Sequence, residues 1–376
     1  MDRDLAVLMI AASEFDSDLY YATGFLAPDP FIHIQHLGRK VLVMNDLELD
    51  RAKSQAKVDD ILALSKYEAA AKARGKERPG TTDTVAAILQ EMGIKRLMVP
   101  AIFPLRHADD LRSRGFEITT KPDPFFEERM FKSEEEIAKI RASQIAVERA
   151  LEKALGILAE STVRNSVLSY RDEPVTSESI KKVINVGLME LDCVSQHTII
   201  AAGRQGCDPH NEGSGPLRPN EGIVMDIFPR SGTTRYFSDM TRTVVKGKAP
   251  DGLKKLYDAV LEGQLLGLSM VKDGADGKEI HAAITSLFDR KGYTTGVKDG
   301  RMQGYFHGTG HGLGLDVHEP PRINKSGELL KSGMVVTVEP GLYYHDIGAV
   351  RIEDLVVVRK DGCENLTTFP KELEIR

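Results

Sequence analysis

The strongest constraint on the fold is the segment 222–245, which places two aspartates in neighbouring β-prone runs. Asp226 lies inside an apolar run and Asp239 inside a second run, with turn residues between them. A hairpin with Gly232 and Thr233 at its tip would place the two carboxylates directly opposite each other. Because facing like charges destabilise a hairpin, such a pair predicts a bound cation between them. The alternative is that both aspartates are solvated residues at strand ends.

The composition is that of an ordinary globular protein. With 376 residues, 41% of them apolar and 28% charged, we expect two domains with sizeable cores. The net charge of −6 and the lack of a basic cluster argue against a nucleic-acid or anionic-membrane partner. The opening apolar run, residues 5–12, is too short for a membrane span, and its mixed-charge flank is unlike a signal peptide.

The three cysteines, Cys193, Cys207 and Cys363, are far apart in the chain and outside any CxxC spacing. An odd number of widely separated cysteines is typical of reduced thiols rather than of a disulfide framework. We therefore expect a cytoplasmic protein.

Residues 1–124 alternate strand-like and helix-like segments, which predicts an α/β domain. The expected strands are 5–11, 31–35, 40–44, 61–64, 96–99 and 116–120, and the expected helices are 47–56, 82–92 and 104–114. The glycines of this region do not form a GxGxxG phosphate-binding loop. Pro122 and Pro124 then interrupt the pattern in a polar stretch, which predicts a linker and a second domain over residues 125–376.

The second domain begins with a strong helix signal. Ser133, followed three residues later by Glu136, forms a capping box, and an apolar stripe continues to about residue 160. A helix at 178–190, a strand at 196–201 and the aspartate hairpin follow, and the same order of elements recurs with helices from 251 and at 278–290 and a hairpin at 335–358. The second hairpin carries Glu339 and Glu353. This repeat predicts a pseudo-twofold α+β domain whose two hairpins each deliver two carboxylates to one place.

Between the hairpins lies a glycine-rich segment, 306–321, that contains His307, His311 and His318. Four glycines in seven positions exclude a helix, so His307 and His311 are not the ligand pair of a helical zinc site. The glycines would let the backbone approach a bound group closely. The alternative is a surface turn with solvated histidines.

Five residues in their local contexts resemble a known group of enzymes: Asp226 in VMDIFPR, Asp239 in SDMTRT, His311 in HGTGHGLGLDVHE, Glu339 in TVEPGLY and Glu353 in VRIED. They resemble the proline-specific metallopeptidases of the methionine aminopeptidase and prolidase group, which have the pita-bread fold. The resemblance implies a creatinase/prolidase-type α/β domain over residues 1–124, a catalytic pita-bread domain over 125–376, and a homodimer. The segments YATGF at 21–25 and FKSEE at 131–135 resemble further landmarks of that group.

The same resemblance implies the roles of the site residues. The five residues would bind two divalent ions, and His210, His307, His318 and Arg351 would line the substrate site. We expect Glu339 to act as general base and proton donor, with the role of a pure ligand as the alternative. His210 is expected to stabilise the oxyanion, and His318 to take part in catalysis beside it.

Charge balance supports two ions independently of the resemblance. Four carboxylates carry about four negative charges at neutral pH, which two divalent cations neutralise. Oxygen ligands with a single imidazole favour manganese or cobalt, with zinc or iron as the alternatives. Two such ions would hold a bridging hydroxide that attacks the scissile carbonyl.

The activity that the resemblance implies is hydrolysis of the bond between an N-terminal residue and proline, in a dipeptide or a short peptide. We favour an Xaa-Pro dipeptidase over an aminopeptidase P that acts on longer peptides. A creatinase-like amidinohydrolase and a metal-free binding protein with the same fold are further alternatives. This chain has twelve residues between Asp226 and Asp239, two more than is usual in the group. An even number of extra residues leaves both aspartates on the same face of the hairpin, but it puts the shape of the pocket rim in question.

Overall fold

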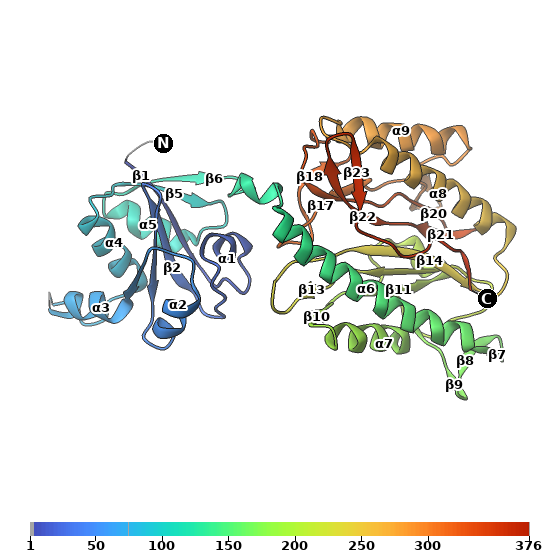
Figure 1. Cartoon of the computed structure of the whole chain (residues 1–376), viewed down its shortest axis with the longest axis horizontal. Helices are drawn as coiled ribbons and strands as arrows, with labels where there is room; N and C mark the ends of the chain where they lie inside the picture. Colours follow the sequence, from blue (N-terminus) through green and yellow to red (C-terminus); the bar gives the residue numbers. More distant parts are fainter. Residues whose placement is uncertain (1–3, 74, 376) are drawn as a thin grey trace. The chain divides into compact units, whose positions relative to one another are not determined.

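The computed structural model describes residues 4–73 and 75–375. The chain divides into two compact units, Met1–Glu127 and Glu128–Arg376 (Figure 1). Across the described ranges, no helix has the length and apolar character needed to cross a membrane. All three cysteines are free thiols, as expected.

The first unit is an α/β sandwich around a six-stranded sheet with the order β4-β3-β2-β1-β5-β6. Its strands are β1 (Leu5–Ala11), β2 (Phe31–His36), β3 (Arg39–Met44), β4 (Asp60–Ala63), β5 (Arg96–Pro100) and β6 (Glu117–Lys121), and its helices are α1 (Ser17–Thr23), α2 (Leu49–Gln55), α3 (Leu64–Ala73), α4 (Thr81–Glu91) and α5 (Leu105–Ser113). Successive strand residues point to opposite faces, so Leu8 packs with the α4 residue Val85 while Met9 packs with the α1 residue Leu19.

The α/β prediction for this part of the chain is confirmed, with six expected strands and three expected helices found close to their predicted positions. Two helices, α1 and α3, were not predicted. Helix α1 has only seven residues, but its ends carry the usual signals: Asp16 accepts a hydrogen bond from the Leu19 amide, and Gly24 follows in the left-handed conformation. Helix α3 buries only Tyr67, so its sequence has little apolar stripe to detect.

The second unit contains two halves with the same order of elements. The first half consists of α6 (Glu134–Glu160), α7 (Ser177–Met189), β11 (Ile199–Ala202), β12 (Ile223–Ile227) and β14 (Met240–Lys246), and the second of α8 (Asp251–Met270), α9 (Gly277–Arg290), β17 (Gly310–Gly312), β19 (Val335–Val338) and β22 (Asp354–Arg359). In each half the strands pair in the order β11-β12-β14 or β17-β19-β22. In Figure 1 the α8 and α9 pair lies along the upper side of the strands and α7 along the lower side. The predicted pseudo-twofold α+β architecture is confirmed.

Each half has its own core, in which the two helices pack against strands of the same half. The first core joins α6 and α7 to β11, β12 and β14, and the second joins α8 and α9 to β19 and β22. The helix α6 begins as predicted, because the Ser133 hydroxyl accepts from the Glu136 amide and the Glu136 carboxylate accepts from the Ser133 amide.

Short elements complete the second unit. They are η1 (Glu127–Met130), β7 (Thr162–Arg164), β8 (Val167–Tyr170), β9 (Glu173–Pro174), β10 (Cys193–Val194), η2 (Gly203–Cys207), β13 (Arg230–Ser231), β15 (Gly296–Lys298), β16 (Arg301–Gln303), β18 (Glu319–Ile323), β20 (Gly341–Tyr344), β21 (Gly348–Arg351), β23 (Gly362–Asn365) and β24 (Glu374–Ile375). Strands β20 and β21 continue the register of the pair β19 and β22. Glu339 and Glu353 lie between the two paired regions, where they occupy facing positions.

The predicted register of the aspartate hairpin is wrong by two residues, which is one period of a β-strand. Asp226 pairs with Thr241, not with Asp239, and the turn is centred between Thr233 and Thr234. The reason is a contact far away in sequence: Asp192 accepts hydrogen bonds from the Thr233 amide at 2.9 Å and the Ser231 hydroxyl at 3.2 Å. Asp239 still lies two residues from Thr241, so both aspartates remain on one face of the hairpin.

Candidate metal centre

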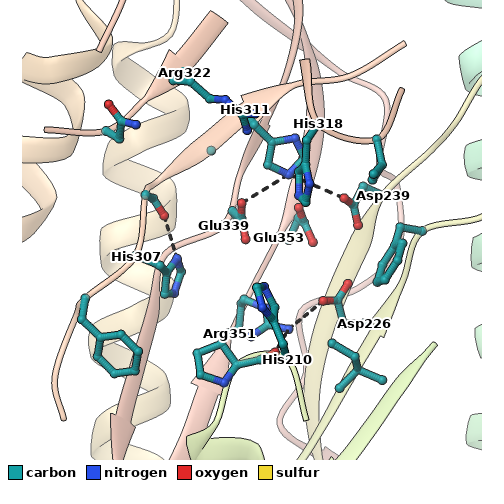
Figure 2. A pocket seen from close by; sticks show the side chains of 18 of the residues that line it. His210, Asp226, Asp239, His307, His311, His318, Arg322, Glu339, Arg351 and Glu353 are labelled. Carbon is teal, nitrogen blue, oxygen red and sulfur yellow. Dashed lines mark hydrogen bonds and ion pairs between the residues drawn. The ribbon is translucent and has the colours of Figure 1, made fainter. Parts of the chain in front are cut away.

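One cavity in the second unit brings together all nine residues that the sequence singled out. It has a volume of about 560 Å³ and is lined by His210, Asp226, Asp239, His307, His311, His318, Glu339, Arg351 and Glu353 (Figure 2). The aspartates come from the first hairpin, the glutamates and Arg351 from the second, and three of the histidines from the glycine-rich segment. The loop after η2 supplies His210. The size is typical of a pocket for a small ligand.

The glycines of the histidine segment allow β17 to lie against its neighbours. A Cβ atom on Gly310 would come within 1.9 Å of the Thr337 carbonyl oxygen, and one on Gly312 within 2.2 Å of the Pro320 carbonyl oxygen. A side chain at either position would therefore force β17 away from the adjoining strands. His311, between these two glycines, is held at the inner wall of the cavity.

His311 is a neutral ring that offers an electron pair to the centre of the cavity. Burial, with His318 nearby, lowers the pKa of His311 to about 3. Its Nδ1 lies 3.1 Å from the carbonyl oxygen of Gly312, and because a carbonyl only accepts, Nδ1 carries the proton. The Nε2 electron pair then faces Asp239 Oδ2 at 3.7 Å and Glu339 Oε1 at 3.4 Å (Figure 2).

The carboxyl groups around this nitrogen are crowded and short of hydrogen-bond donors. Burial, reinforced by Glu353 and Asp226, raises the pKa of Asp239 well above its usual range, and burial and Glu339 do the same for Glu353. Burial also raises the pKa of Glu339 to about 8, although Arg351 opposes the shift. Among the described residues, Asp226 Oδ1, Asp239 Oδ1 and Glu353 Oε1 are buried without a hydrogen-bond partner.

These observations fit a bound cation. One ligand atom from each of Asp239, His311 and Glu353 lies within 4.8 Å of the other two. Without a cation, protons relieve the repulsion between the carboxylates, as the raised pKa values indicate, and a divalent ion would replace those protons. The residues present therefore suit a hard divalent ion with oxygen ligands and one imidazole.

Asp226 differs from the other three carboxylates because it already has a cationic partner. Its Oδ2 accepts from Arg351 Nη2 at 2.6 Å, and both side chains are buried. The remaining oxygen, Oδ1, is one of the unpartnered atoms and is free to bind an ion. Glu353 is held in a similar way, since its Oε2 accepts from the Thr241 hydroxyl at 2.7 Å.

Tyr343 joins Arg351 to His307 and was not identified as a site residue from the sequence. Its hydroxyl accepts from Arg351 Nη1 at 2.9 Å and lies 2.9 Å from His307 Nε2. His307 Nδ1 donates to the Gly308 carbonyl at 2.7 Å, so Nε2 accepts from the tyrosine hydroxyl. Burial, with Arg351 nearby, lowers the pKa of His307 to about 3, which keeps this ring neutral.

A sequence signal for Tyr343 did exist, because the residue lies in the same TVEPGLY context as Glu339. Two further cavity residues, Phe228 and Phe306, also lie in segments that the sequence singles out, the VMDIFPR context and the glycine-rich segment. Ile199, Arg322 and Asn324 carry no such signal and are brought in by the fold. Ile199 begins β11, whereas Arg322 and Asn324 lie at the end of β18 and just after it, so their spacing in the chain does not indicate that they meet.

Comparisons with known proteins agree with this architecture. Residues 138–360 match the sequence pattern of metallopeptidase family M24. An Xaa-Pro dipeptidase of Pyrococcus horikoshii is 31% identical over 285 residues, which cover 75% of each chain. An uncharacterized peptidase of Bacillus subtilis is 35% identical over 245 residues, which cover 64% of this chain and 66% of that relative, just under two thirds of its length.

Among solved structures, an X-Pro aminopeptidase from Thermotoga maritima superposes with a TM-score of 0.81 and 24% sequence identity, covering 99% of this chain and 97% of the other. At that identity the likeness concerns the fold. It extends over the α/β unit as well as the unit that carries the cavity.

Proposed function

Because this chain belongs to metallopeptidase family M24, we propose that it is an exopeptidase with two divalent metal ions that hydrolyses the bond between an N-terminal residue and proline. The observation that carries the proposal is the His311 Nε2 electron pair facing the oxygens of Asp239 and Glu339, with three further carboxylate oxygens unpartnered around it. In this proposal the second unit is the catalytic domain, and the first is the creatinase/prolidase-type domain.

Five residues would hold the ions: Asp226, Asp239, His311, Glu339 and Glu353. Their four carboxylates balance two divalent cations, and manganese or cobalt suits the oxygen-rich set, with zinc or iron as alternatives. Bound ions would polarise the scissile carbonyl and acidify a water molecule. The rest of the chemistry belongs to side chains of this chain.

Glu339 is the residue best placed to move a proton. It lies in the wall of the cavity beside His311, and its backbone amide donates to the Thr309 carbonyl at 2.7 Å, which fixes the start of the side chain. A carboxylate in this position can accept a proton from the attacking water and return it to the leaving proline nitrogen. Its alternative role is that of a ligand only.

The histidines that line the cavity and Arg351 would bind the substrate. His210 and His318 line the cavity on the loops at its rim, where a ring N–H can donate to the carbonyl oxygen as it gains negative charge. Arg351 is held by Asp226 and Tyr343, and its Nη2 also lies 3.4 Å from the Pro209 carbonyl. This places the loop that carries His210 against the same guanidinium that we assign to substrate binding.

The substrate class rests on the relatives. The Pyrococcus horikoshii protein bears the name Xaa-Pro dipeptidase, and a second relative of that name, from Pyrococcus furiosus, is 37% identical over 178 residues. A dipeptidase is therefore favoured over an aminopeptidase P. The complete set of four carboxylates and one histidine supports a peptidase over a creatinase-like amidinohydrolase or a binding protein without metal, because neither alternative requires all five ligands. The proposal includes a homodimer, which sedimentation analysis would test.

The deciding experiment combines metal analysis with a proline-release assay. Protein stripped with a chelator should be inactive and should regain activity with close to two equivalents of manganese or cobalt. An Xaa-Pro dipeptide should release proline, whereas the matched Xaa-Ala dipeptide should react far more slowly. Faster cleavage of an Xaa-Pro tripeptide would reassign the enzyme to aminopeptidase P, and full activity in excess chelator without bound metal would contradict the proposal.

A further inference from the structure

Two buried cations in the segment that precedes α6, Arg129 in η1 and Lys132 just before the N-cap Ser133, are not used by the proposed chemistry. The Lys132 side chain is 2% exposed and that of Arg129 is 9% exposed. Both contact Glu319: Lys132 Nζ donates to Oε1, and Arg129 Nη2 donates to Oε2 at 2.9 Å. Each oxygen of this buried carboxylate thus has its own cationic partner from a segment about 190 residues away. Lys132 belongs to the FKSEE segment, in which the sequence indicates a role for Ser133 as the helix cap but none for Lys132.

Glu319 lies at an irregular point of the sheet beside the cavity. Strand β18 pairs with β17 in the order His311 with Arg322 and then Gly312 with Glu319, so the register shifts between these two pairs. A strand with such a bulge has fewer ladder hydrogen bonds to hold it in place. The two cations supply the missing restraint at Glu319.

The turn before Glu319 is shaped around the same contact. A Cβ atom on Gly314 would come within 2.6 Å of Glu319 Oε1 and 3.0 Å of Lys132 Cε, so only glycine leaves room for the ion pair. The Gly314 carbonyl accepts from the Phe237 amide at 2.8 Å, which ties the turn to the end of the aspartate loop. Arg129 also donates to Asp316 in this turn at 2.8 Å.

His318 is the residue that this turn presents to the cavity. It immediately precedes Glu319, and its ring lies 4.4 Å from the His311 ring in an edge-to-face arrangement (Figure 2). Glu319 makes its contacts with the segment that precedes α6, while His318 lines the cavity. Holding the Glu319 side chain in place therefore limits the positions that the adjacent His318 can adopt.

We infer that Lys132, together with Arg129, is a positioning residue for His318, which it controls by holding Glu319. The inference rests on the proposed function, in which His318 contacts the substrate. Lys132 itself touches neither the cavity nor the candidate ligands, so its effect on the reaction is transmitted through the turn 314–319.

A double-mutant cycle distinguishes positioning from general stabilisation. Lys132→Met should lower kcat/KM for an Xaa-Pro dipeptide by about 10–100-fold, the range found for residues that orient a functional group. In a His318→Ala background the same change should lower kcat/KM less than about twofold, because the residue that Lys132 positions is already gone. The loss of melting temperature should be the same in both backgrounds, and bound metal should stay at the parent level.

Hydrogen exchange tests the same inference without any activity. Lys132→Met should speed exchange over residues 312–320 and at the Phe237 amide, whose acceptor is the Gly314 carbonyl. Glu134→Gln is the matched control, because Glu134 lies only two residues from Lys132 but pairs with Arg359 at the surface. It should leave kcat/KM within about twofold of the parent, as expected for an exposed ion pair.

Equal losses of kcat/KM in the two backgrounds would overturn the inference, and so would unchanged exchange in Lys132→Met. If Lys132→Met does not fold, Glu319→Gln takes its place in the same cycle. A parent protein that releases no proline would defeat the proposed function, and the exchange result would still decide whether Lys132 holds the turn.

Discussion

Replacing Arg242 with methionine should show how strongly metal binding and stability depend on the buried contacts that hold Glu353. Arg242 is 2% exposed and pairs with Asp354 at 2.9 Å, the residue that follows Glu353. It also donates to the carbonyl oxygen of Glu353 at 2.6 Å and to those of Phe369 and Pro370 at 2.7 and 3.0 Å. One guanidinium thus joins β14, the second hairpin and the C-terminal segment.

The magnitude follows from what remains after the change. Removing one partner of a buried ion pair costs about 3–5 kcal/mol. Asp354 keeps hydrogen bonds from Lys371 and Asn365, so its charge is not left alone and we expect the lower end, about 3 kcal/mol. For a unit of this size, that corresponds to a fall in Tm of roughly 6–12 °C. Metal binding should weaken by about tenfold, because Glu353 loses a backbone restraint.

Thermal unfolding followed by calorimetry, with and without added manganese, measures both effects. Arg359→Met is the matched control, because Arg359 makes the same kind of carboxylate pairs at a partly exposed position. Exposed pairs contribute about 0–1 kcal/mol each, so losing both pairs should lower Tm by no more than about 8 °C and by less than the loss in Arg242→Met. Equal Tm losses in the two variants, or unchanged metal affinity in Arg242→Met, would refute the reasoning.

Three further predictions concern the centre, the first unit and the aspartate loop. Glu339→Gln should lower kcat by about 10²–10⁴-fold with far less effect on substrate affinity, and a near-normal kcat in steady-state assays would leave Glu339 as a ligand only. Burial lowers the pKa of His33 from 6.5 to about 4. The contribution of neutral His33 to the free energy of unfolding is therefore complete above pH 6.5, and up to about 3 kcal/mol of it is lost as the pH falls towards 4. His33→Leu should remove this part of the pH dependence of Tm. A variant with the same pH profile of Tm as the parent would contradict this assignment. Deleting Thr233 and Thr234 together should keep both aspartates on one face of the hairpin. Deleting Thr233 alone changes the parity of the loop and turns one strand over. This variant should lose bound metal and on the order of several kcal/mol of stability, the cost of misplacing a few large side chains. A single deletion that binds metal better than the double deletion would show that the turn is not centred there.

Features that depend on neighbours in the chain were predictable from the sequence. The capping box of Ser133 and Glu136 marks the start of α6 because its hydrogen bonds join residues three apart. The spacing of glycines around His311 excluded a helix, and the structure gives the reason at Gly310, which lies against the Thr337 carbonyl. The repeat of helices and hairpins was visible because each half follows its own local periodicity.

The candidate residues of the centre could also be named from the sequence, because each lies in a short and distinctive context. The contacts that hold them in place could not. The hydrogen bonds of Tyr343 to Arg351 and His307 depend on a hairpin pairing, and one of the two cations that contact Glu319 is Lys132, 187 residues earlier. Such contacts depend on which surfaces the fold brings together.

The aspartate hairpin shows most clearly which features the sequence determines by itself and which depend on contacts in the folded protein. Its sequence determined that two β-prone runs would form a hairpin with Asp226 and Asp239 on one face, since the side-chain period of a strand is two residues. The position of the turn was decided by Asp192, whose carboxylate binds the Thr233 amide and the Ser231 hydroxyl from another part of the unit. Period and propensity are properties of consecutive residues, whereas the choice between two registers of equal parity depends on hydrogen bonds that exist only once the distant segments have packed together.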